Sequence, residues 1–365
     1  MKILQISDSL KQRFGVTSFL YNYNSSIDRS KVNFDYLIID AENEIVSKLT
    51  EFGCKIFYMP KLSLFNIYEF IRFIDQFFKK TNYDIIHSHF YQIDAICSNL
   101  AFKNGIKYYI SHSHNTKYSE NKIRSIRNFF LSVPIKFMST HFCACSEKAG
   151  NFLFGRKVLS IRKKKLYIIP NSIDYKKFYF DENIRKTIRK QYGIKNELVF
   201  GSVGSLKKQK NHIFMIKVFK LIIKRFPNSK LVFIGDGALR EKLKKICIKL
   251  KIENHVIFTG TVKDTWNYYN MLDCFLFPSL FEGFGLSLLE AEINGLPCIC
   301  SDKVPSEPFI SKRAYKLSLY NSKKKWADIS IEQANIGRNF EKVDNYFDIS
   351  YQAKMLTNFY KGLMS

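Results

Sequence analysis

Short apolar runs alternate with longer amphipathic stretches along most of this chain, and this alternation constrains its fold more than any other feature. Runs such as 2–6 and 34–38 have the length and the branched or aromatic residues of buried strands. Stretches such as 212–226 carry apolar residues at helical spacing. Strands that alternate with helices predict parallel sheets covered by helices, so the expected fold class is α/β.

A turn-like segment, Ile169-Pro170-Asn171-Ser172-Ile173-Asp174, separates two such series. Proline disfavours helix in the residue before it, and an Asn-Ser pair suits a turn. We therefore expect two doubly wound domains, residues 1–170 and 171–345, which agrees with roughly 100–200 residues per domain. Residues 346–365 contain a final amphipathic helix, with the apolar face formed by Ala353, Leu356, Phe359 and Leu363.

The chain carries a net charge of +26, from 58 Lys and Arg against 32 Asp and Glu. A charge of this size favours a polyanionic partner such as nucleic acid, anionic lipid or a phosphate-bearing substrate. Codon bias is the alternative cause, because Lys, Asn, Ile, Phe and Tyr all have AT-rich codons. Charge alone does not separate the two.

The cysteines and the apolar runs indicate the compartment. The eight cysteines lie mostly inside apolar runs and without metal-ligand spacing, so we expect reduced core residues. No apolar run reaches the roughly 18 residues of a bilayer span, and the first residues do not follow the pattern of a signal peptide. We expect a cytoplasmic protein.

The segment 281–291 carries the most chemistry. Its glycines, Gly283 and Gly285, follow a strand-like run and precede a helix-forming run. A loop that opens a helix presents backbone N–H groups and the positive end of the helix dipole, which suits a phosphate. Glu282 and Glu290 suit the hydroxyls of a sugar or ribose better than an anion. The alternative is an ordinary helix start whose acidic residues complement the dipole.

Two further glycine turns follow expected strands. In 201–212, a turn that contains Ser205 leads to Lys210, which is placed to neutralise a diphosphate at the carboxyl end of a strand. A solvated lysine run is the alternative, and the spacing matches neither a P-loop nor GxGxxG. Gly235 and Gly237 end the next strand. In the first domain, the turn with Gly15 brings backbone close to a ligand or is a plain βα turn.

Four of the seven histidines form two clusters at strand ends, His87-Ser88-His89 and His112-Ser113-His114. In a strand, His112 and His114 share one face. Zinc would need four ligands, and the sequence places no further acid or thiol nearby, so no metal is predicted. For His87, His89 and His112, the alternative is a core histidine bonded to neighbouring backbone.

Taken in order, these motifs resemble those of bacterial family-4-type retaining glycosyltransferases of the GT-B fold, in particular the EpsF-like capsular and exopolysaccharide enzymes. The resemblance runs from Met1 to about Glu307 and again, more loosely, at the last helix. The matching stretches are 14–16, 24–34, 86–89, 111–116, 169–174, 209–212, 233–237, 258–260, 273–279 and 282–290.

The resemblance implies two Rossmann-like domains that face each other across a cleft, with the last helix packing back on the first domain. It implies a nucleotide diphosphate sugar as donor, UDP-sugar favoured, and a glycan or lipid-linked acceptor in cell-surface polysaccharide synthesis. It also implies retention of anomeric configuration, no metal or other cofactor and no nucleic acid partner. The alternatives are a nucleotide-sugar 2-epimerase of the same fold and a non-catalytic basic protein that binds nucleic acid or lipid.

Carried over by position, the resemblance assigns Glu290 to ribose hydroxyls, Glu282 to the donor sugar and Lys210 to the diphosphate. His114 faces the sugar, and a two-residue shift of the match would give that role to His112. The expected catalytic residues are therefore His114, Glu282 and Lys210. The expected donor-binding residues are Gly15, Ser205, Gly235, Gly237, Thr261, Val262, Gly283, Phe284, Gly285, Leu286, Ser287 and Glu290.

The sequence departs from the family pattern at Ser205, where relatives often carry Arg. One phosphate-binding cation is then missing, or Lys207 or Lys208 supplies it. A basic and apolar stretch, 122–137, lies in the first domain. It suits an anionic membrane surface near a lipid-linked acceptor, so we expect peripheral association with the inner face of the cell membrane.

Overall fold

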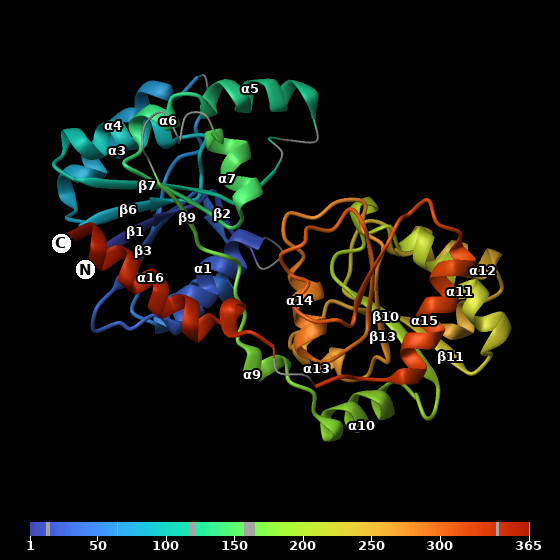
Figure 1. The fold of residues 1–365 in the computed structure, drawn as a ribbon. Helices are drawn as coiled ribbons and strands as arrows, with labels where there is room; N and C mark the ends of the chain where they lie inside the picture. The colour runs from blue at the N-terminus through green and yellow to red at the C-terminus, as the bar shows by residue number, and fades with distance from the viewer. Residues whose placement is uncertain are drawn as a thin grey trace. The chain divides into compact units, whose positions relative to one another are not determined.

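The computed structural model describes residues 1–11, 15–63, 65–116, 118, 121–156, 165–340 and 343–364. The chain forms two compact units, Met1–Ile173 with Tyr346–Ser365, and Asp174–Asn345. Figure 1 shows that each unit contains a sheet with helices on both faces. The division between Ile173 and Asp174 lies inside the turn-like segment 169–174 that is expected to separate two domains.

The first unit is built on a seven-stranded parallel sheet with the order β5-β3-β1-β6-β7-β8-β9. Two short strands, β2 (Ser9–Leu10) and β4 (Asp40–Ala41), follow β1 and β3 along the chain. They form a separate parallel pair. The strands of the main sheet are β1 (Lys2–Ile6), β3 (Asn33–Ile38), β5 (Ile56–Tyr58), β6 (Ile85–Ser88), β7 (Tyr108–Ser113), β8 (His141–Ala144) and β9 (Leu166–Ile168).

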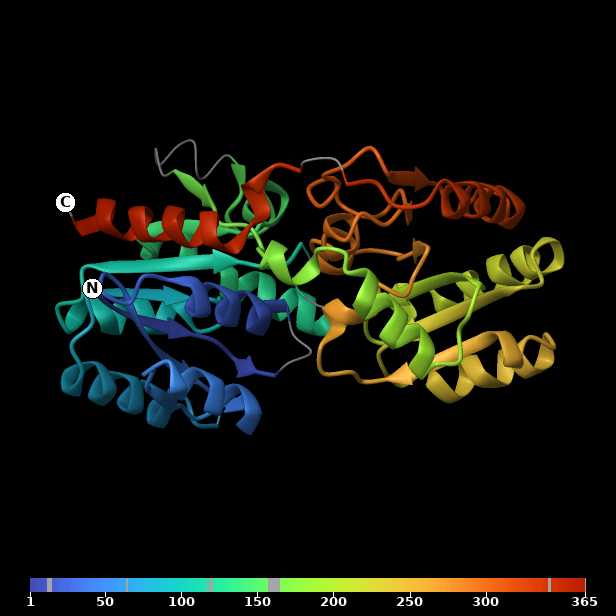
Figure 2. The same cartoon turned by 90° about the horizontal axis from the view of Figure 1, so that it is seen from below.

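Helices cover both faces of this sheet because the strand side chains alternate between them (Figure 2). Ile3 packs toward α1 and α16, whereas Leu4 and Ile6 pack toward α3 and α4. The helices of this unit are α1 (Gly15–Ser26), α2 (Asn43–Glu51), α3 (Ile67–Lys80), α4 (Asp94–Lys103), α5 (Lys122–Ser132), α6 (Ile135–Met138), α7 (Glu147–Phe154) and α16 (Ile349–Met364).

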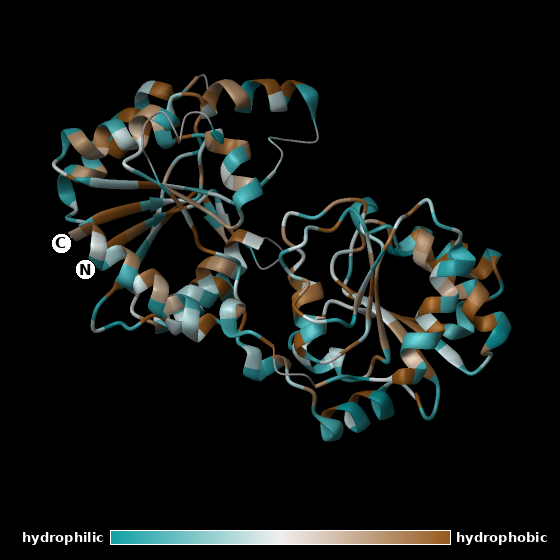
Figure 3. Cartoon of the chain, in the orientation of Figure 1, coloured by the Kyte–Doolittle hydropathy of each residue, from teal (hydrophilic) through white to brown (hydrophobic). Residues whose placement is uncertain are grey.

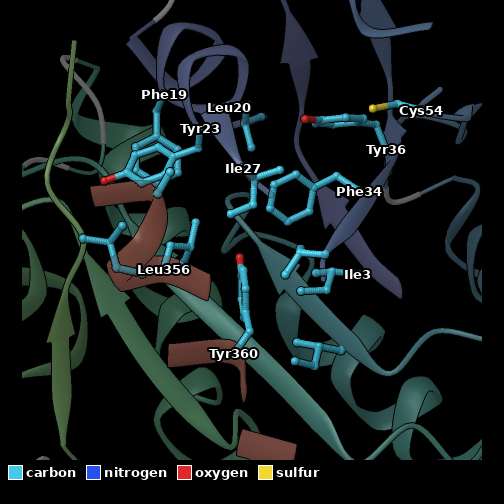
Figure 4. Close-up of a cluster of buried hydrophobic side chains, with 14 of the residues drawn as sticks. Ile3, Phe19, Leu20, Tyr23, Ile27, Phe34, Tyr36, Cys54, Leu356 and Tyr360 are labelled. Atoms are coloured by element: carbon cyan, nitrogen blue, oxygen red, sulfur yellow. The ribbon is translucent and has the colours of Figure 1, made fainter. Parts of the chain in front are cut away.

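The last helix, α16, completes the core of the first unit. It packs along α1, and its Leu356 and Tyr360 are buried in the cluster that holds Phe19, Tyr23 and Phe34 (Figure 4). Hydrophobic and hydrophilic residues alternate along such surface helices (Figure 3). A chain segment that follows the whole second unit is therefore part of the first unit's core.

The second unit has a six-stranded parallel sheet with the order β12-β11-β10-β13-β14-β15. Its strands are β10 (Leu198–Val203), β11 (Ser229–Ile234), β12 (Val256–Gly260), β13 (Cys274–Phe277), β14 (Cys298–Ser301) and β15 (Ala314–Leu317). The predicted α/β class with two doubly wound sheets is confirmed.

Helices α11, α12 and α15 pack against one face of the second sheet, and α13 and α14 lie on the other (Figure 1). Short 3-10 turns η1 (Lys208–Lys210), η2 (Glu253–His255) and η3 (Asn345–Phe347) connect some of the elements. The α-helices of this unit are α9 (Tyr175–Phe178), α10 (Glu182–Gln191), α11 (His212–Arg225), α12 (Arg240–Lys249), α13 (Thr265–Tyr269), α14 (Leu286–Ile293) and α15 (Lys323–Ile336).

Chain order reverses once in each sheet. In the first sheet β1 lies between β3 and β6, and in the second β10 lies between β11 and β13. In open parallel sheets, the loops that leave such a switch point diverge at the carboxyl ends of the strands and leave room for a ligand. The topology thus selects the loops after β1 and β6 and those after β10 and β13.

The expected reduced cysteines are confirmed, because all eight are buried thiols. Burial raises the pKa of Cys97, Cys143 and Cys298 well above the ordinary value, so these thiols are protonated and poorly nucleophilic. Across the described residues, every helix is too short or too polar to traverse a bilayer.

Truncation of Leu356 tests the contribution of α16 to the first unit. Leu356→Ala removes a side chain that is 3% exposed and should lower the free energy of unfolding by about 2–5 kcal/mol. Met355→Ala is the matched control, because Met355 is 48% exposed on the same helix and should change stability by no more than about 0.5 kcal/mol. Urea denaturation followed by circular dichroism measures both. Equal losses of stability in the two variants would show that burial of Leu356 on α16 does not stabilise the core of the first unit.

Candidate functional site

Two glycines bring the ends of β10 and β11 into backbone contact. Gly204 and Gly235 have φ angles of 139° and 130°, which side-chain-bearing residues rarely adopt. Gly204 N donates to Ile234 O at 2.9 Å, and Gly235 N donates to Gly260 O at 3.0 Å. A Cβ at position 235 would lie 2.3 Å from Gly204 O, so only glycine fits here without a shift of the backbone.

Gly237 makes a similar close approach, since a Cβ there would lie 2.7 Å from both the N and the O atom of Leu206. Ser205 lies between these turns and is half-buried. After β12, Thr261 is exposed and Val262 is half-buried. The expected glycine turns therefore lie beside one another at the carboxyl edge of the second sheet.

Lys210 and Glu282 meet beside the switch point of the second sheet. Lys210 follows β10, Glu282 follows β13, and Lys210 Nζ lies 2.9 Å from Glu282 Oε1. Only 17% and 8% of the two side chains are exposed. The ammonium also lies 4.6 Å from the ring centroid of Phe277. The alternative of a solvated lysine run is correct for Lys207 and Lys208, which are exposed. It is wrong for Lys210.

Gln209 is a site residue to which the sequence assigned no role. Its Nε2 donates to Glu282 Oε2 at 3.3 Å and to Phe281 O at 3.0 Å. Gln209 thus bonds to the carboxylate oxygen of Glu282 that does not pair with Lys210. Its position beside Lys210 in the sequence was the available signal.

The N-terminus of α14 has the features expected of a phosphate cradle. Gly285 caps the helix with a φ angle of 102°, and Leu286 begins it. Backbone N–H groups in the first turn of a helix lack intrahelical acceptors and carry the positive end of the dipole. Ser287 Oγ is buried and has no hydrogen-bond partner among the described residues. Gly283 is half-buried and Phe284 is buried just before this turn.

Glu290 lies farther along α14 and accepts a short hydrogen bond from the Tyr269 hydroxyl. Burial raises the pKa of both groups. The bond fixes one carboxylate oxygen and leaves the other for a ligand hydroxyl. Sequence reasoning missed Tyr269, because α13 carries no motif that distinguishes it from an ordinary surface turn.

Glu292 lies two residues after Glu290 on α14 and hydrogen-bonds to the loop between β14 and β15. Its Oε2 accepts from the backbone N–H groups of Ile310 and Ser311 at 3.0 and 2.7 Å. Its Oε1 is buried without a partner among the described residues. Burial is the largest cause that raises the pKa of Glu292 to about 7.

The histidine clusters meet on the first sheet, where β6 and β7 are neighbours. His87 Nε2 lies 3.1 Å from His112 Nδ1, and His89 Nδ1 lies 2.7 Å from His114 Nε2. The alternative of core histidines bonded to neighbouring backbone is wrong about the bonding partners. These imidazoles hydrogen-bond to other side chains. Burial lowers the pKa of all four, to about 3 for His87 and His114, so the rings are neutral near pH 7.

His114 is only partly buried, whereas His112 is 1% exposed. A ligand at the carboxyl edge of this sheet can therefore reach His114 but not His112. Gly15, the first residue of α1, leaves open space where a Cβ would lie. Phe14, its neighbour in the family motif, lies outside the described residues. His114 and Gly15 belong to the first unit and the other expected site residues to the second.

Three of the histidines present more potential metal ligands than the sequence indicated. Ring nitrogens of His87, His89 and His112 lie within 4.8 Å of one another. Their hydrogen bonds already occupy both nitrogens of His87 and of His89. His112 Nε2 alone among these six nitrogens has no partner in the described part of the chain. A metal ion would have to displace those bonds.

Comparisons with known proteins place the second unit in a sequence family. Residues 184–330 match the family described as glycosyl transferases group 1. The chain is 29% identical over 339 residues to the putative glycosyltransferase EpsF of Bacillus subtilis, which covers 89% of this chain and 86% of that protein. It is 28% identical to an Escherichia coli UDP-Gal:alpha-D-GlcNAc-diphosphoundecaprenol alpha-1,3-galactosyltransferase, over 74% of this chain and 72% of that protein.

A solved structure shares the fold over the whole length. Anabaena HepE in complex with UDP aligns with a TM-score of 0.77 over 99% of this chain and 100% of its own. The two sequences are 15% identical. This likeness shows the fold. The ligand of the present chain has to be inferred from the chain's own residues.

Glu292→Gln tests the buried carboxyl of α14. The folded-state pKa is about 7 against an ordinary 4.5, so the folded protein retains a proton that the unfolded chain loses. The free energy of unfolding should therefore fall as pH rises from about 4.5 to 7 and reach its full loss above pH 7, by up to about 3 kcal/mol. Glutamine keeps the acceptor oxygen for Ile310 and Ser311, and should flatten this slope and raise Tm at pH 8.

Glu332→Gln is the matched control, because Glu332 is exposed on α15. Thermal unfolding between pH 5 and pH 8 measures all three proteins. An unchanged slope in Glu292→Gln would show that this carboxyl does not titrate with folding.

Proposed function

We propose that this chain, which is a glycosyltransferase of group 1 with the GT-B fold, transfers a hexosyl group from a UDP-sugar to a glycan or lipid-linked acceptor. The reaction retains the anomeric configuration and serves the synthesis of cell-surface polysaccharide. One observation carries the assignment of the donor site. A buried lysine–glutamate pair lies beside the N-terminus of α14 at the switch point of the second sheet.

Known relatives support the donor and acceptor classes. HepE has been solved with UDP and with UDP-glucose, and the E. coli relative is named for a UDP-galactose donor. The same relative is named for an acceptor on diphosphoundecaprenol, a lipid-linked diphosphate. These names favour UDP over other nucleotides and a lipid-linked glycan as acceptor.

The second unit supplies groups that stabilise a leaving diphosphate. Bond cleavage at the anomeric carbon develops negative charge on the phosphate and positive charge on the sugar. Lys210 and the first-turn N–H groups of α14 are fixed positive groups that suit the developing phosphate charge. Because these groups supply the charge stabilisation, the proposed reaction needs no metal ion. Lys207 and Lys208, exposed on the same loop, compensate for Ser205 in place of a family arginine.

The carboxylates recognise hydroxyls rather than phosphate. Lys210 neutralises Glu282, so this carboxylate adds little repulsion toward a diphosphate and remains an acceptor for a sugar hydroxyl. Glu290, oriented by Tyr269, accepts from the ribose hydroxyls. On the first unit, neutral His114 hydrogen-bonds a donor-sugar hydroxyl instead of acting as a cation. The proposed mechanism uses front-face attack without a covalent protein nucleophile.

Helix α5 suits peripheral contact with an anionic membrane. Ile123 and Phe130 are 79% and 67% exposed on a helix that contains Lys122, Arg124 and Arg127 and no acidic residue. A basic helix that exposes large apolar side chains binds the interface of anionic lipids. Such contact on the inner face of the cell membrane would bring the enzyme to a lipid-linked acceptor.

Substitution of Lys210 tests the donor site. Lys210→Met removes a charge-assisted contact worth about 1.5–3 kcal/mol, so UDP should bind about ten- to a hundredfold more weakly by calorimetry. Lys217→Met, at an exposed position of α11, should change Kd less than twofold. The double variant Lys210→Met/Glu282→Gln separates loss of the ammonium from repulsion by the unpaired carboxylate. Unchanged UDP binding in Lys210→Met would refute this site.

The reaction itself is tested with a radiolabelled UDP-sugar and a lipid-linked acceptor. The expected product is labelled acceptor, and Lys210→Met should reduce its rate of formation. Conversion of one nucleotide sugar into another, with no transfer, would instead identify a 2-epimerase. Salt-sensitive binding of DNA with no affinity for UDP would identify a non-catalytic basic protein.

The membrane surface is tested by sedimentation with liposomes. Phe130→Ser should reduce the fraction bound to vesicles that contain phosphatidylglycerol several-fold, because it removes apolar area from the interface. Phe65→Ser is the control, because Phe65 is a fully exposed aromatic outside α5. Equal binding to neutral and anionic vesicles would contradict the electrostatic part of the proposal.

A further inference from the structure

We propose that Gln5 is a positioning residue whose side-chain amide sets the tautomers of His89 and His114, so that His114 presents Nδ1 to the donor sugar as a hydrogen-bond acceptor. The proposal rests on the proposed function of His114. Gln5 is the fourth of the five residues of β1, between the apolar Leu4 and Ile6, and is 3% exposed. A polar side chain at such a position must find its partners within the protein.

Gln5 lies between two chains of hydrogen bonds. Its Oε1 lies 2.8 Å from His89 Nε2, and its Nε2 lies 3.5 Å from the hydroxyl of Tyr360 on α16. An amide oxygen can only accept a hydrogen bond. The short contact therefore places a proton on His89 Nε2.

The first chain runs from Gln5 through His89 to His114. A neutral imidazole carries one N–H and one lone pair, so a proton on His89 Nε2 leaves its Nδ1 as an acceptor. His89 Nδ1 lies 2.7 Å from His114 Nε2, so the proton between them belongs to His114 Nε2. The same rule leaves a lone pair on His114 Nδ1. Burial lowers the pKa of both rings, which removes the doubly protonated state that would break this order.

The second chain runs in the other direction, from Gln5 through Tyr360 to His87 and His112. The Gln5 amide N–H points to the hydroxyl oxygen of Tyr360, so the hydroxyl donates its own proton to His87 Nδ1, 2.6 Å away. His87 Nε2 then donates to His112 Nδ1 at 3.1 Å. This chain ends on His112, buried below His114 with ring centroids 4.2 Å apart, and does not include His114.

The two chains end on ring nitrogens with opposite hydrogen-bonding roles, one on His114 and one on His112. His114 Nδ1 is an acceptor, which suits a sugar hydroxyl that donates, whereas His112 Nε2 is a donor and is buried. Reversal of the Gln5 amide would reverse the protons along the first chain and turn His114 Nδ1 into a donor. Gln5, which is linked to His114 through His89, thus decides whether His114 Nδ1 accepts a hydrogen bond from a sugar hydroxyl or donates one to it.

Nitrogen-15 NMR of the histidine rings tests the assignment without any need for activity. In the wild-type protein, His89 and His114 should both show a protonated Nε2 and an unprotonated Nδ1. Gln5→Met keeps the side-chain length and removes the acceptor, so both rings should shift to the reversed or mixed tautomers. Gln5→Glu keeps an acceptor oxygen and should restore the wild-type tautomers. A protonated Nδ1 on wild-type His114, or unchanged tautomers in Gln5→Met, would overturn the proposal.

Kinetics separate this effect from a general loss of structure. Gln5→Met should lower kcat for sugar transfer at least tenfold while UDP affinity stays within twofold. His87→Phe is the matched control, because it breaks the second chain beyond Tyr360 and leaves both Gln5 contacts in place, so the His114 tautomer should be unchanged and kcat should stay within twofold of wild type. An equal loss of kcat in both variants would show a merely structural role for Gln5.

Failure of the underlying function gives a different result. His114→Ala with undiminished sugar transfer would refute the role of His114 at the donor sugar, and with it the kinetic effect of Gln5. The NMR tautomers of the wild-type protein would still report whether Gln5 orders the two rings.

Discussion

A parallel sheet has to be covered on both faces, because each strand sends side chains to both sides and none of its faces tolerates water. This constraint explains the alternation of strands and helices in both units. It also explains why α16 belongs to the first unit although it follows the second in sequence. Leu356 and Tyr360 share with α1 the cover of the sheet face that holds Ile3 and Phe34, so this face would be only partly covered without them.

The same topology locates the chemistry. Connections that leave neighbouring strands in opposite directions at β10 and β13 leave room between their loops, and the residues with functional potential lie on these loops. Close backbone contact between Gly204 and Gly235 keeps this edge of the sheet compact. The N–H groups proposed to bind phosphate belong to the backbone at the start of α14, so the geometry around Gly285 fixes their positions.

Buried polar groups in both units are held by specific side-chain partners. Glu282 is compensated by Lys210, and Glu290 is held by Tyr269. On the first sheet, Gln5 joins two chains of neutral side chains, one of which ends on His114. In each case a group that would be costly to bury alone has a hydrogen-bond or ion-pair partner. The same bonds orient the atoms that are proposed to bind the ligand.

The sequence by itself determined the α/β class, the division near residue 170 and the glycine turns, because hydrophobic periodicity and glycine placement are local signals. It also indicated Lys210, Glu282 and Glu290 through their spacing around a loop and a helix start. Only the tertiary structure decided that Lys210 pairs with Glu282, that Tyr269 orients Glu290 and that His112 is buried where His114 is accessible. The physical reason is that the paired residues lie on separate elements: Lys210 follows β10 and Glu282 follows β13, whereas Tyr269 lies on α13 and Glu290 on α14. Contacts across a sheet depend on strand order and register, which local periodicity does not encode.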